Sequence, residues 1–501
     1  MNGGGMVMDR PGGPWKPVDQ TFPALSHTLD TEVCIVGGGF IGIVTAYLLA
    51  RRGYRPVVVE AGRIGCGAVR MSTGTALSQH RLRSAHLWKR HGESVARAYY
   101  DVHEDALSWL ERTCRRLDAR CDLKRTPSWL LAENVDHVQQ LEEEAEAYFK
   151  LGMDGRMADK PPVPFTGLPA LKMNDQIQLD PVRFCSKLVR WLSLENIQLY
   201  EQTRAVDIVR GKHPSVVLEN GKMIRARHIV CATHYPLQHL SSRLQLERAA
   251  AGVFTMPETM EEGIFTTLSD PSWAFRSLSD GKLLVSGGAE RVSRKTDPHV
   301  LRDELRRWVK EHFPEAAEEK IWTLQQVRTS DRMPLAGPVE AGKKDLYTAT
   351  GFGPWGLSGG VAGAQMIADH ISGMRNRWSY LFTPARFEAK QELPNVVRHA
   401  ASYVKGRIQR RECQSLEDLQ PGEGALVRQE GIRTGAYRGE NGDLYMVNPE
   451  CTHAGCEVQW NRVNTTWDCP CHGSCFDVEG NVLEGPAVKP LERFYTMEKR
   501  K

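Results

Sequence analysis

Two loops near the C-terminal end of the chain each carry one cysteine and one histidine, at Cys451-x-His453 and Cys469-x-x-His472. Thiolates and imidazoles are good ligands for transition metals. Structural zinc sites usually begin with two cysteines on one turn, because both thiolates then bind the same tetrahedral ion. Here each turn pairs a cysteine with a histidine, which favours a two-iron cluster with both thiolates on one iron and both imidazoles on the other. Zinc remains the alternative.

A glycine-rich turn near the N-terminal end has the spacing of a dinucleotide-binding site. Gly37-x-Gly39-x-x-Gly42 lies between an apolar run that predicts a buried strand and a segment that predicts a helix. The glycines permit a tight turn, a close approach of the backbone to a pyrophosphate, and close packing of helix on strand. The start of the helix offers N–H groups to phosphates. Glu60, about 20 residues further on, can accept hydrogen bonds from ribose hydroxyls, so the motif fits either FAD or NAD.

The residues after Glu60 and several distant motifs favour FAD. Small and hydroxyl side chains follow Glu60, and residues 350–353 form a second glycine-rich turn before a predicted helix. From about Glu32 to about Gly373, the chain resembles the FAD-dependent D-amino-acid oxidase / glycine oxidase / sarcosine oxidase superfamily. Further motifs that carry this resemblance are Arg328-x-x-Asp331-x-x-Pro334, Asp180-Pro181-x-Arg183, residues 201–206 and residues 229–233.

The resemblance implies a non-covalent FAD, because no histidine or cysteine stands where covalent members attach their flavin. The usual G-x-S-G of the family is replaced by residues 67–70, Gly-Ala-Val-Arg, so the contacts that the family makes there are not carried over. In the family, the position of Val206 packs near the adenine and the 351–357 loop lies over the flavin. The residues expected to bind FAD are Gly37, Gly39, Phe40, Ile41, Gly42, Glu60, Ala61, Arg63, Val206, Gly351, Gly353, Trp355, Gly356 and Leu357.

The reaction that the resemblance implies is hydride removal from a carbon next to an amine nitrogen, with the flavin as carrier. Such a reaction needs the C–H bond aimed at the flavin and the substrate held still, more than it needs a strong base. Arg276 and Arg328 are the candidates to hold a substrate carboxylate, because a guanidinium offers a fork of donors. His234 is the third catalytic candidate and would shape the pocket with Tyr235 and Trp355.

From about Glu412 to its end, the chain resembles a Rieske [2Fe-2S] domain. By that resemblance, Cys451 and Cys469 bind one iron of the cluster, and His453 and His472 bind the other.

Further features of this segment also match Rieske proteins. Cys456 and Cys471 match the extra cysteines of the cytochrome bc and b6f type, which implies a disulfide between the two loops, and residues 485–487 match the proline loop that covers the cluster. Because a disulfide is unusual in a reducing cytosol, a shielded bond and two free thiols both stay open. Ser474 matches the serine that donates to a cluster sulfur and raises the potential. The tyrosine that often assists it is Phe476 here, which predicts a lower potential than in respiratory Rieske proteins.

The elements that must position these sites follow from the pattern along the chain. Residues 32–60 predict a strand–helix–strand unit, residues 76–150 predict mostly helix, and short strands with glycine turns follow residue 412. The expected fold is an α/β Rossmann-like FAD-binding domain with an inserted α+β substrate domain, followed by a C-terminal all-β Rieske domain. The expected boundaries are an N-terminal arm at 1–30, the oxidoreductase domain with its discontinuous FAD-binding and substrate subdomains at 31–383, a linker at 384–411 and the Rieske domain at 412–501.

Composition agrees with a soluble protein of several domains. The chain has 501 residues, of which 41% are hydrophobic and 25% charged, and its net charge of +4 gives no case for a nucleic-acid partner. The apolar stretch 34–50 contains four glycines and is shorter than the about 20 residues of a membrane helix. The N-terminus lacks the apolar core of a secretion signal. We therefore expect a cytoplasmic protein without a membrane span.

The two expected cofactors handle electrons differently: FAD accepts two as a hydride, whereas a Rieske cluster passes one at a time. Their combination favours a dehydrogenase that oxidises an amine or amino-acid C–N bond and releases electrons singly. One alternative is a flavin/iron–sulfur relay between protein partners, and another is a flavoenzyme with a non-amine substrate. The expected partners are a small-molecule amine or amino acid and a protein that accepts or donates one electron.

Overall fold

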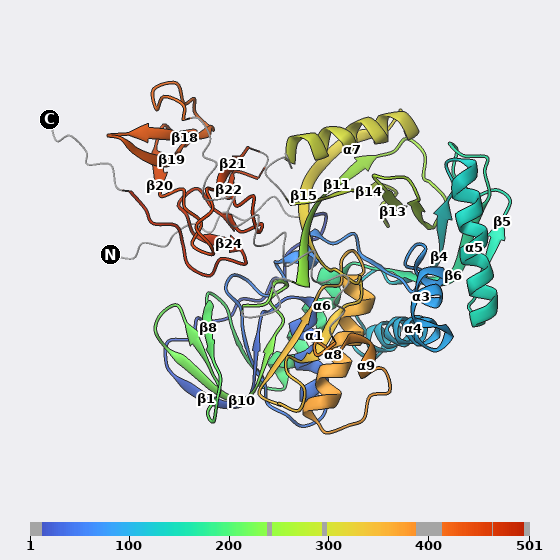
Figure 1. Cartoon of the computed structure of the whole chain (residues 1–501), viewed down its shortest axis with the longest axis horizontal. Helices are drawn as coiled ribbons and strands as arrows, with labels where there is room; N and C mark the ends of the chain where they lie inside the picture. The colour runs from blue at the N-terminus through green and yellow to red at the C-terminus, as the bar shows by residue number, and fades with distance from the viewer. Residues whose placement is uncertain (1–12, 238–242, 293–297, 387–412, 463, 495–501) are drawn as a thin grey trace.

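The computed structural model describes residues 13–237, 243–292, 298–386, 413–462 and 464–494. Figure 1 shows an α/β body, a second large sheet with helices around it, and a small β domain beside two long strands, β11 and β15. Most of the expected linker at 384–411 lies outside the described residues. None of the helices in the described ranges combines the length and apolar character needed to cross a bilayer.

A mostly parallel sheet forms the base of the α/β body. Its strand order is β16-β17-β10-β1-β2-β7, and the β8–β9 hairpin extends from β10. Strand β1 pairs in parallel with β10 on one side and with β2 on the other, so the strand order reverses beside β1. Ligands of such sheets bind at the carboxyl ends of the strands, at this reversal. The strands are β1 (Leu29–Val36), β2 (Val57–Val59), β7 (Gln198–Tyr200), β8 (Ala205–Val209), β9 (Ser215–Leu218), β10 (Met223–Cys231), β16 (Leu335–Pro338) and β17 (Leu346–Thr350).

Helices α1 (Phe40–Ala50), α6 (Pro181–Leu194) and α8 (Gly356–Ile371) pack together beside this sheet (Figure 1). Helix α1 is apolar on almost every side, as a helix must be when it is buried on every side. Helix α6 begins at a proline, and the Asp180 carboxylate before it accepts the N–H groups of Val182 and Arg183, at 2.9 Å each. Two short helices, α2 (Ala68–Met71) and α9 (Ser379–Phe382), complete this body.

A nine-stranded sheet forms the second body, in the order β15-β11-β14-β13-β12-β4-β6-β3, with β5 paired to β6. Residues 76–150 are mostly helical, as predicted, but β4 runs through them because its apolar half pairs with both β12 and β6. The strands are β3 (Thr75–Ala76), β4 (Lys124–Leu131), β5 (Gly155–Ala158), β6 (Ala170–Gln178), β11 (Leu244–Thr255), β12 (Ile264–Thr267), β13 (Trp273–Ser277), β14 (Leu283–Arg291) and β15 (Ala317–Thr329). The helices are α3 (Arg83–His91), α4 (Glu93–Arg116), α5 (Val135–Leu151) and α7 (Pro298–His312).

The C-terminal part is all-β, as the sequence predicts. It consists of two small antiparallel sheets, and the fully buried Trp467 and Phe476 lie in its core. The strands are β18 (Gly424–Gln429), β19 (Ile432–Arg438), β20 (Leu444–Val447), β21 (Gln459–Asn461), β22 (Thr466–Asp468), β23 (Cys475–Phe476) and β24 (Val482–Glu484).

The described part of the N-terminal segment runs along the α/β body. Val18 and Leu25 are buried there, and the Leu25 N–H donates to the Thr203 hydroxyl at 3.0 Å. The Trp15 indole N–H donates to the Ser72 carbonyl at 2.7 Å. This segment therefore packs against the domain that it precedes.

Candidate functional site

In the glycine turn after β1, a side chain does not fit at two of the three motif glycines. Gly37 has φ +108°, and a Cβ there would lie 2.5 Å from the Ala232 carbonyl oxygen. A Cβ at Gly42 would lie 1.9 Å from the Gly37 carbonyl oxygen, whereas one at Gly39 would meet nothing. Two of the three glycines are thus required by packing, and the third leaves the approach to the start of α1 open. This is the cradle that a pyrophosphate needs.

Glu60 is fixed beside this turn by backbone donors. Its two carboxylate oxygens accept the N–H groups of Gly38 and Gly62, at 2.8 Å each. Burial raises the pKa of the Glu60 carboxyl, while these two hydrogen bonds and the nearby Arg204 act in the opposite direction. The carboxylate is therefore held in one orientation at the end of β2.

A cavity of about 360 Å³ opens at this turn. Several residues that the sequence predicts for FAD line it: Gly37, Gly39, Phe40, Ile41, Glu60, Ala61, Gly353, Gly356 and Leu357. The glycine cradle, the open start of α1 and the Glu60 carboxylate fit the pyrophosphate and ribose of a dinucleotide.

The other residues predicted for FAD lie next to this lining or elsewhere. Gly42 packs beneath the turn, and Val206 follows the lining residue Ala205. Arg63 donates through Nη2 to the Val18 carbonyl at 2.8 Å. Gly351, at φ +79°, packs against Thr329, and Trp355 lines a second cavity.

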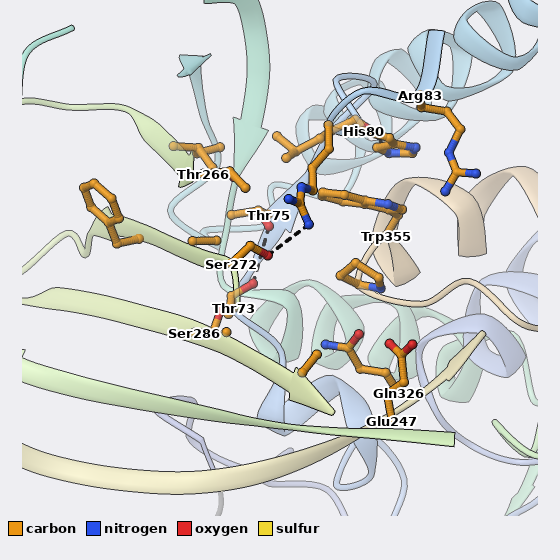
Figure 2. A pocket seen from close by; sticks show the side chains of 18 of the residues that line it. Thr73, Thr75, His80, Arg83, Glu247, Thr266, Ser272, Ser286, Gln326 and Trp355 are labelled. Atoms are coloured by element: carbon orange, nitrogen blue, oxygen red, sulfur yellow. Dashed lines mark hydrogen bonds between the residues drawn. The ribbon is translucent and has the colours of Figure 1, made fainter. Parts of the chain in front are cut away.

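The second cavity measures about 650 Å³ and adjoins the first, with which it shares Thr73, Ser286, Gln326 and Pro354. Figure 2 shows Glu247 and Gln326 on its strand wall, opposite Trp355. The rings of Trp355 and His80 stack with centroids 4.4 Å apart and planes 10° apart. Burial lowers the pKa of His80 well below its ordinary value, so this stack is uncharged at neutral pH.

The three predicted catalytic residues are not together. Arg276 and Arg328 line the second cavity, whereas His234 lines the first. Arg276 is committed to the protein: Nε and Nη2 donate to the Thr73 carbonyl at 2.9 and 2.8 Å, and Nη1 to the Ser277 carbonyl at 3.1 Å. Burial lowers its pKa to about 10, which leaves it charged at neutral pH.

Other cations also line the second cavity. Arg328 forms an ion pair with Glu247, with Nη2 and Oε2 3.0 Å apart. Arg81 donates to the Ser272 hydroxyl at 3.1 Å and the Leu268 carbonyl at 3.0 Å. Within the described residues, the guanidinium groups of Arg83 and Arg332 make no hydrogen bond or ion pair. Burial and the nearby Arg332 both lower the pKa of Arg83. The cavity therefore offers two uncommitted guanidinium groups.

The predicted cluster ligands meet at the tips of two loops in the C-terminal part. The rings of His453 and His472 have centroids 4.9 Å apart. The pKa of Cys451 is lowered to about 7, first by its hydrogen bond with Cys469 and then by backbone N–H groups that include that of His453. The Ser474 hydroxyl also hydrogen-bonds to Cys451. Two converging sulfurs, backbone donors to them and two adjacent imidazoles fit a Rieske cluster.

The two loops are tied together by a disulfide between Cys456 and Cys471, fifteen residues apart in sequence. This is the bond that the resemblance to the cytochrome bc and b6f type implies. It leaves Cys451 and Cys469 as thiols, both buried.

Residues 32–370 match the family model described as FAD dependent oxidoreductase (DAO), and residues 411–495 match the Rieske [2Fe-2S] domain. The first match spans more than half of the chain. The chain belongs to the FAD-dependent oxidoreductase family. Its two domains indicate FAD and a Rieske [2Fe-2S] cluster as cofactors, as the sequence predicts.

Relatives of this oxidoreductase agree with both domains. A Bacillus subtilis protein named for its Rieske 2Fe-2S iron–sulfur centre (YhfW) is 32% identical over 484 residues, which are 94% of this chain and 95% of that protein. The gamma-glutamylputrescine oxidoreductase of Escherichia coli is 23% identical over 381 residues, 71% of this chain and 87% of that protein. The glycine oxidase of Geobacillus kaustophilus has the same fold, with a TM-score of 0.62 and 16% identity over 72% of this chain and 99% of its own. The protein is thus an FAD-dependent oxidoreductase with an added Rieske [2Fe-2S] domain.

The Rieske domain of this oxidoreductase forms part of the first cavity. Residues 483–488, which include the predicted cluster-covering loop, line the cavity together with the glycine turn. Arg204 Nη2 donates to the Val482 carbonyl at 2.6 Å, and His234 Nδ1 lies 3.7 Å from Glu484 Oε1. Both domains therefore line the cavity that fits FAD.

Several lining residues were not predicted from the sequence. Residues 67–69 and 71–73 line the first cavity, although residues 67–70 were noted only as a departure from the family pattern. Arg81, Arg83 and Arg332 line the second cavity. The alternation Arg81-x-Arg83 before a helix was the one local signal for the first two of these arginines, and on its own it is typical of a charged surface.

Proposed function

We propose that this oxidoreductase removes a hydride from the carbon next to the amine nitrogen of an amino acid or a related anionic amine. We further propose that the electrons leave one at a time through the Rieske cluster, which Cys451, Cys469, His453 and His472 hold. When bound, FAD supplies the hydride acceptor for such a reaction.

One observation carries this proposal: the cavity that fits FAD lies between the two places that it would connect. On one side it shares Thr73, Ser286, Gln326 and Pro354 with the second cavity, called the larger cavity from this point on. On the other side it is bounded by residues 483–488 of the Rieske domain. A substrate in the larger cavity would therefore sit against one side of the flavin, and the cluster domain would sit near it from another direction.

The charges in the larger cavity support an anionic amine as substrate. Arg83 and Arg332 are free to bind a carboxylate, and a guanidinium–carboxylate contact is a strong, charge-assisted hydrogen bond. Glu247, whose carboxylate pairs with Arg328, places a negative charge on the strand wall that suits an ammonium group (Figure 2). Two similar proteins, a glycine oxidase and a gamma-glutamylputrescine oxidoreductase, are named for amine-bearing compounds, which also favours an amine-bearing substrate.

The other side chains would hold and shield the substrate. Arg276 fixes the Thr73 carbonyl at the boundary of the two cavities. The uncharged His80–Trp355 stack forms an apolar wall that excludes water. Hydride transfer depends on such positioning, because the reacting C–H must be aimed at the flavin ring.

The test is anaerobic absorbance of the purified holoenzyme, mixed in turn with a panel of amino acids and amines. We expect at least one of them to bleach the flavin and then the cluster, with release of ammonia or an aldehyde after hydrolysis of the imine. Bleaching by hydroxy acids alone would overturn the C–N assignment. No bleaching by the panel, with rapid reduction by a ferredoxin or an NADH-linked reductase, would favour a relay between proteins.

A further inference from the structure

Strands β11 and β15 lie at one edge of the nine-stranded sheet, and this pair of strands, the β11–β15 ribbon, has two faces that serve different sites. Successive side chains of a strand point to opposite faces, and directly paired residues share a face. Glu247 pairs with Gln326, and both line the larger cavity. Their neighbours Arg248 and Gln325 pair on the other face. Figure 1 shows the small β domain on this other side of the ribbon, beside β15.

An ion pair links this second face of the ribbon to the Rieske domain. Arg248 Nη1 lies 2.6 Å from Asp468 Oδ2, and both residues are buried. Asp468 is further held by hydrogen bonds from Thr466 and Asn461, at 2.8 and 2.7 Å. A buried ion pair needs such additional partners to offset the loss of hydration. The pair joins β11 to the residue immediately before the ligand Cys469.

A second contact on the same face comes from the neighbouring strand. The Asn464 amide donates to the Thr323 hydroxyl at 2.9 Å, and Thr323 pairs with Ala250. The face thus meets the Rieske domain along both strands of the ribbon.

Gln325 lies on this face beside Arg248, and its side chain has no hydrogen-bond partner among the described residues. It is 6% exposed, and neither atom of its carboxamide makes a hydrogen bond with the described residues. A buried, unsatisfied amide is costly, so its persistence points to a partner beyond the described residues. Gln325 lines the cavity that fits FAD. It is therefore aimed at a place where a ligand group can bind it.

The same carboxamide touches the cluster-binding loop. A Cβ at Gly473 would lie 2.7 Å from Gln325 Oε1, and Gly473 has φ +73°. Glycine is thus required there by its conformation and by the closeness of Gln325. Gly473 directly follows the ligand His472. The side chain of Gln325 consequently lies between the flavin cavity and the loop that carries His472.

The two histidine ligands differ in their surroundings. His472 is 7% exposed and lies beside the loop that meets the ribbon, whereas His453 is exposed to solvent. The cluster therefore has one histidine on the inner side, towards the oxidoreductase domain, and one on the outer side.

We propose that this face of the β11–β15 ribbon is an electron-transfer interface within the chain, docked by Arg248 and Asp468, in which Gln325 connects the flavin cavity to His472. The inference rests on the proposed function for the direction of flow. Each substrate molecule loses two electrons and a proton as a hydride. With both cofactors bound, electrons would pass one at a time beside Gln325 to the cluster. A one-electron acceptor protein would take each of them on the His453 side, and the protons would pass to solvent.

The role of Gln325 is tested by its exchange for leucine in the holoenzyme, with Thr255→Val at the exposed far end of β11 as the matched control. We expect Gln325→Leu to shift the midpoint potentials of both the flavin and the cluster, measured in one redox titration by absorbance and EPR. Thr255→Val is expected to shift neither, and Gln325→Asn, which keeps a neutral carboxamide, to restore part of the effect. Unchanged potentials would overturn the proposal, and a shift of only one would overturn the bridging role.

The docking is tested by chemical access to the two histidines. In the resting holoenzyme, diethyl pyrocarbonate should modify His453 about tenfold faster than His472, as followed by mass spectrometry of their peptides. Arg248→Met should raise the rate at His472 and the amide hydrogen exchange of residues 483–488, and Arg248→Lys should keep both low. The EPR spectrum of the cluster verifies that each variant is folded.

Equal modification rates in the wild-type protein, or no effect of Arg248→Met with an intact cluster, would overturn the docking. These readouts need no substrate. Failure of the amine panel would therefore leave them unchanged, and failure of the docking would leave substrate bleaching unchanged, so the two proposals are separable.

Discussion

At the residue scale, the arginines of the larger cavity differ in what they already bind. Arg276 and Arg328 are arginines that the sequence singles out, and both meet partners in the protein. Arg83 and Arg332 were not singled out, yet their guanidinium groups have no hydrogen-bond or ion-pair partner within the described residues. Residue type and proximity to a motif predict that an arginine is available. They do not predict which backbone carbonyl will reach it, because that depends on segments far apart in the chain.

Arg83→Met is therefore expected to weaken binding of carboxylates in this cavity. A hydrogen bond to a charged group contributes about 1.5–3 kcal/mol, so affinity should fall about 10- to 100-fold. The measurement is titration of the oxidised holoenzyme with small carboxylates, followed by the change in flavin absorbance. Arg115→Met, at an exposed ion pair on α4, is the matched control. Equal affinities in wild type and Arg83→Met would contradict this role.

The cluster potential is also set by single side chains. The Ser474 hydroxyl hydrogen-bonds to Cys451, and Phe476 is buried in the same core as Cys451 and Cys469. A donor to a cluster sulfur favours the reduced state, so Ser474→Ala should lower the midpoint potential by about 60 mV, the equivalent of one hydrogen bond of about 1.4 kcal/mol. Phe476→Tyr should raise it by adding a donor.

Redox titration of the wild-type protein, Ser474→Ala and Phe476→Tyr measures the three midpoint potentials of the cluster. An unchanged midpoint in Phe476→Tyr would contradict the interpretation of Phe476 as a missing donor, and an unchanged midpoint in Ser474→Ala would contradict that of Ser474.

At the scale of elements, the structure follows the sequence where local signals and tertiary packing agree. The strand–turn–helix around Gly37 is such a case, because the glycines, the apolar strand and the apolar helix all require the same arrangement. Strand β4 is the opposite case. It lies within a predicted helical region, and what makes it a strand is its pairing with β6 and β12, which are distant in sequence. Because this pairing depends on distant residues, no local sequence pattern predicts the strand.

Helices α3 and α5 are joined by a buried carboxyl that predicts a pH effect on stability. Glu144 of α5 accepts the N–H groups of Ser84 and Ala85 at the start of α3, at 2.8 Å each. Burial raises its pKa to about 7, from an ordinary value of 4.5, although these bonds act against the shift. The folded protein thus holds this proton more tightly than the unfolded chain does. Its stabilising contribution is complete below about pH 4.5 and is lost as pH rises through about 7.

Glu144→Gln cannot titrate and should lack this decline. The difference in unfolding free energy between variant and wild type should change in favour of the variant by up to about 3 kcal/mol between pH 4.5 and 8. Urea unfolding across this range measures it, with the exposed Glu143→Gln as control. Parallel stability curves for Glu144→Gln and wild type would contradict the prediction.

At the scale of the whole molecule, the β11–β15 ribbon lies between the larger cavity and the Rieske domain. The larger cavity lies on one face of β11 and β15, and the Rieske domain is docked on the other. The sequence predicts both domains and both cofactors, since each has a dense local motif. It does not predict their docking, because Arg248 and Asp468 are 220 residues apart and neither belongs to a motif.

The most direct test of electron transfer within one chain is its dependence on protein concentration. The flavin of the holoenzyme is reduced anaerobically by a substrate found in the amine panel, and oxidation of the flavin by the cluster is followed by stopped-flow absorbance. Transfer inside one chain predicts a first-order rate constant that does not change when the protein is diluted about 100-fold. A rate that falls in proportion to concentration, or a cluster that stays oxidised beside a reduced flavin, would contradict the account.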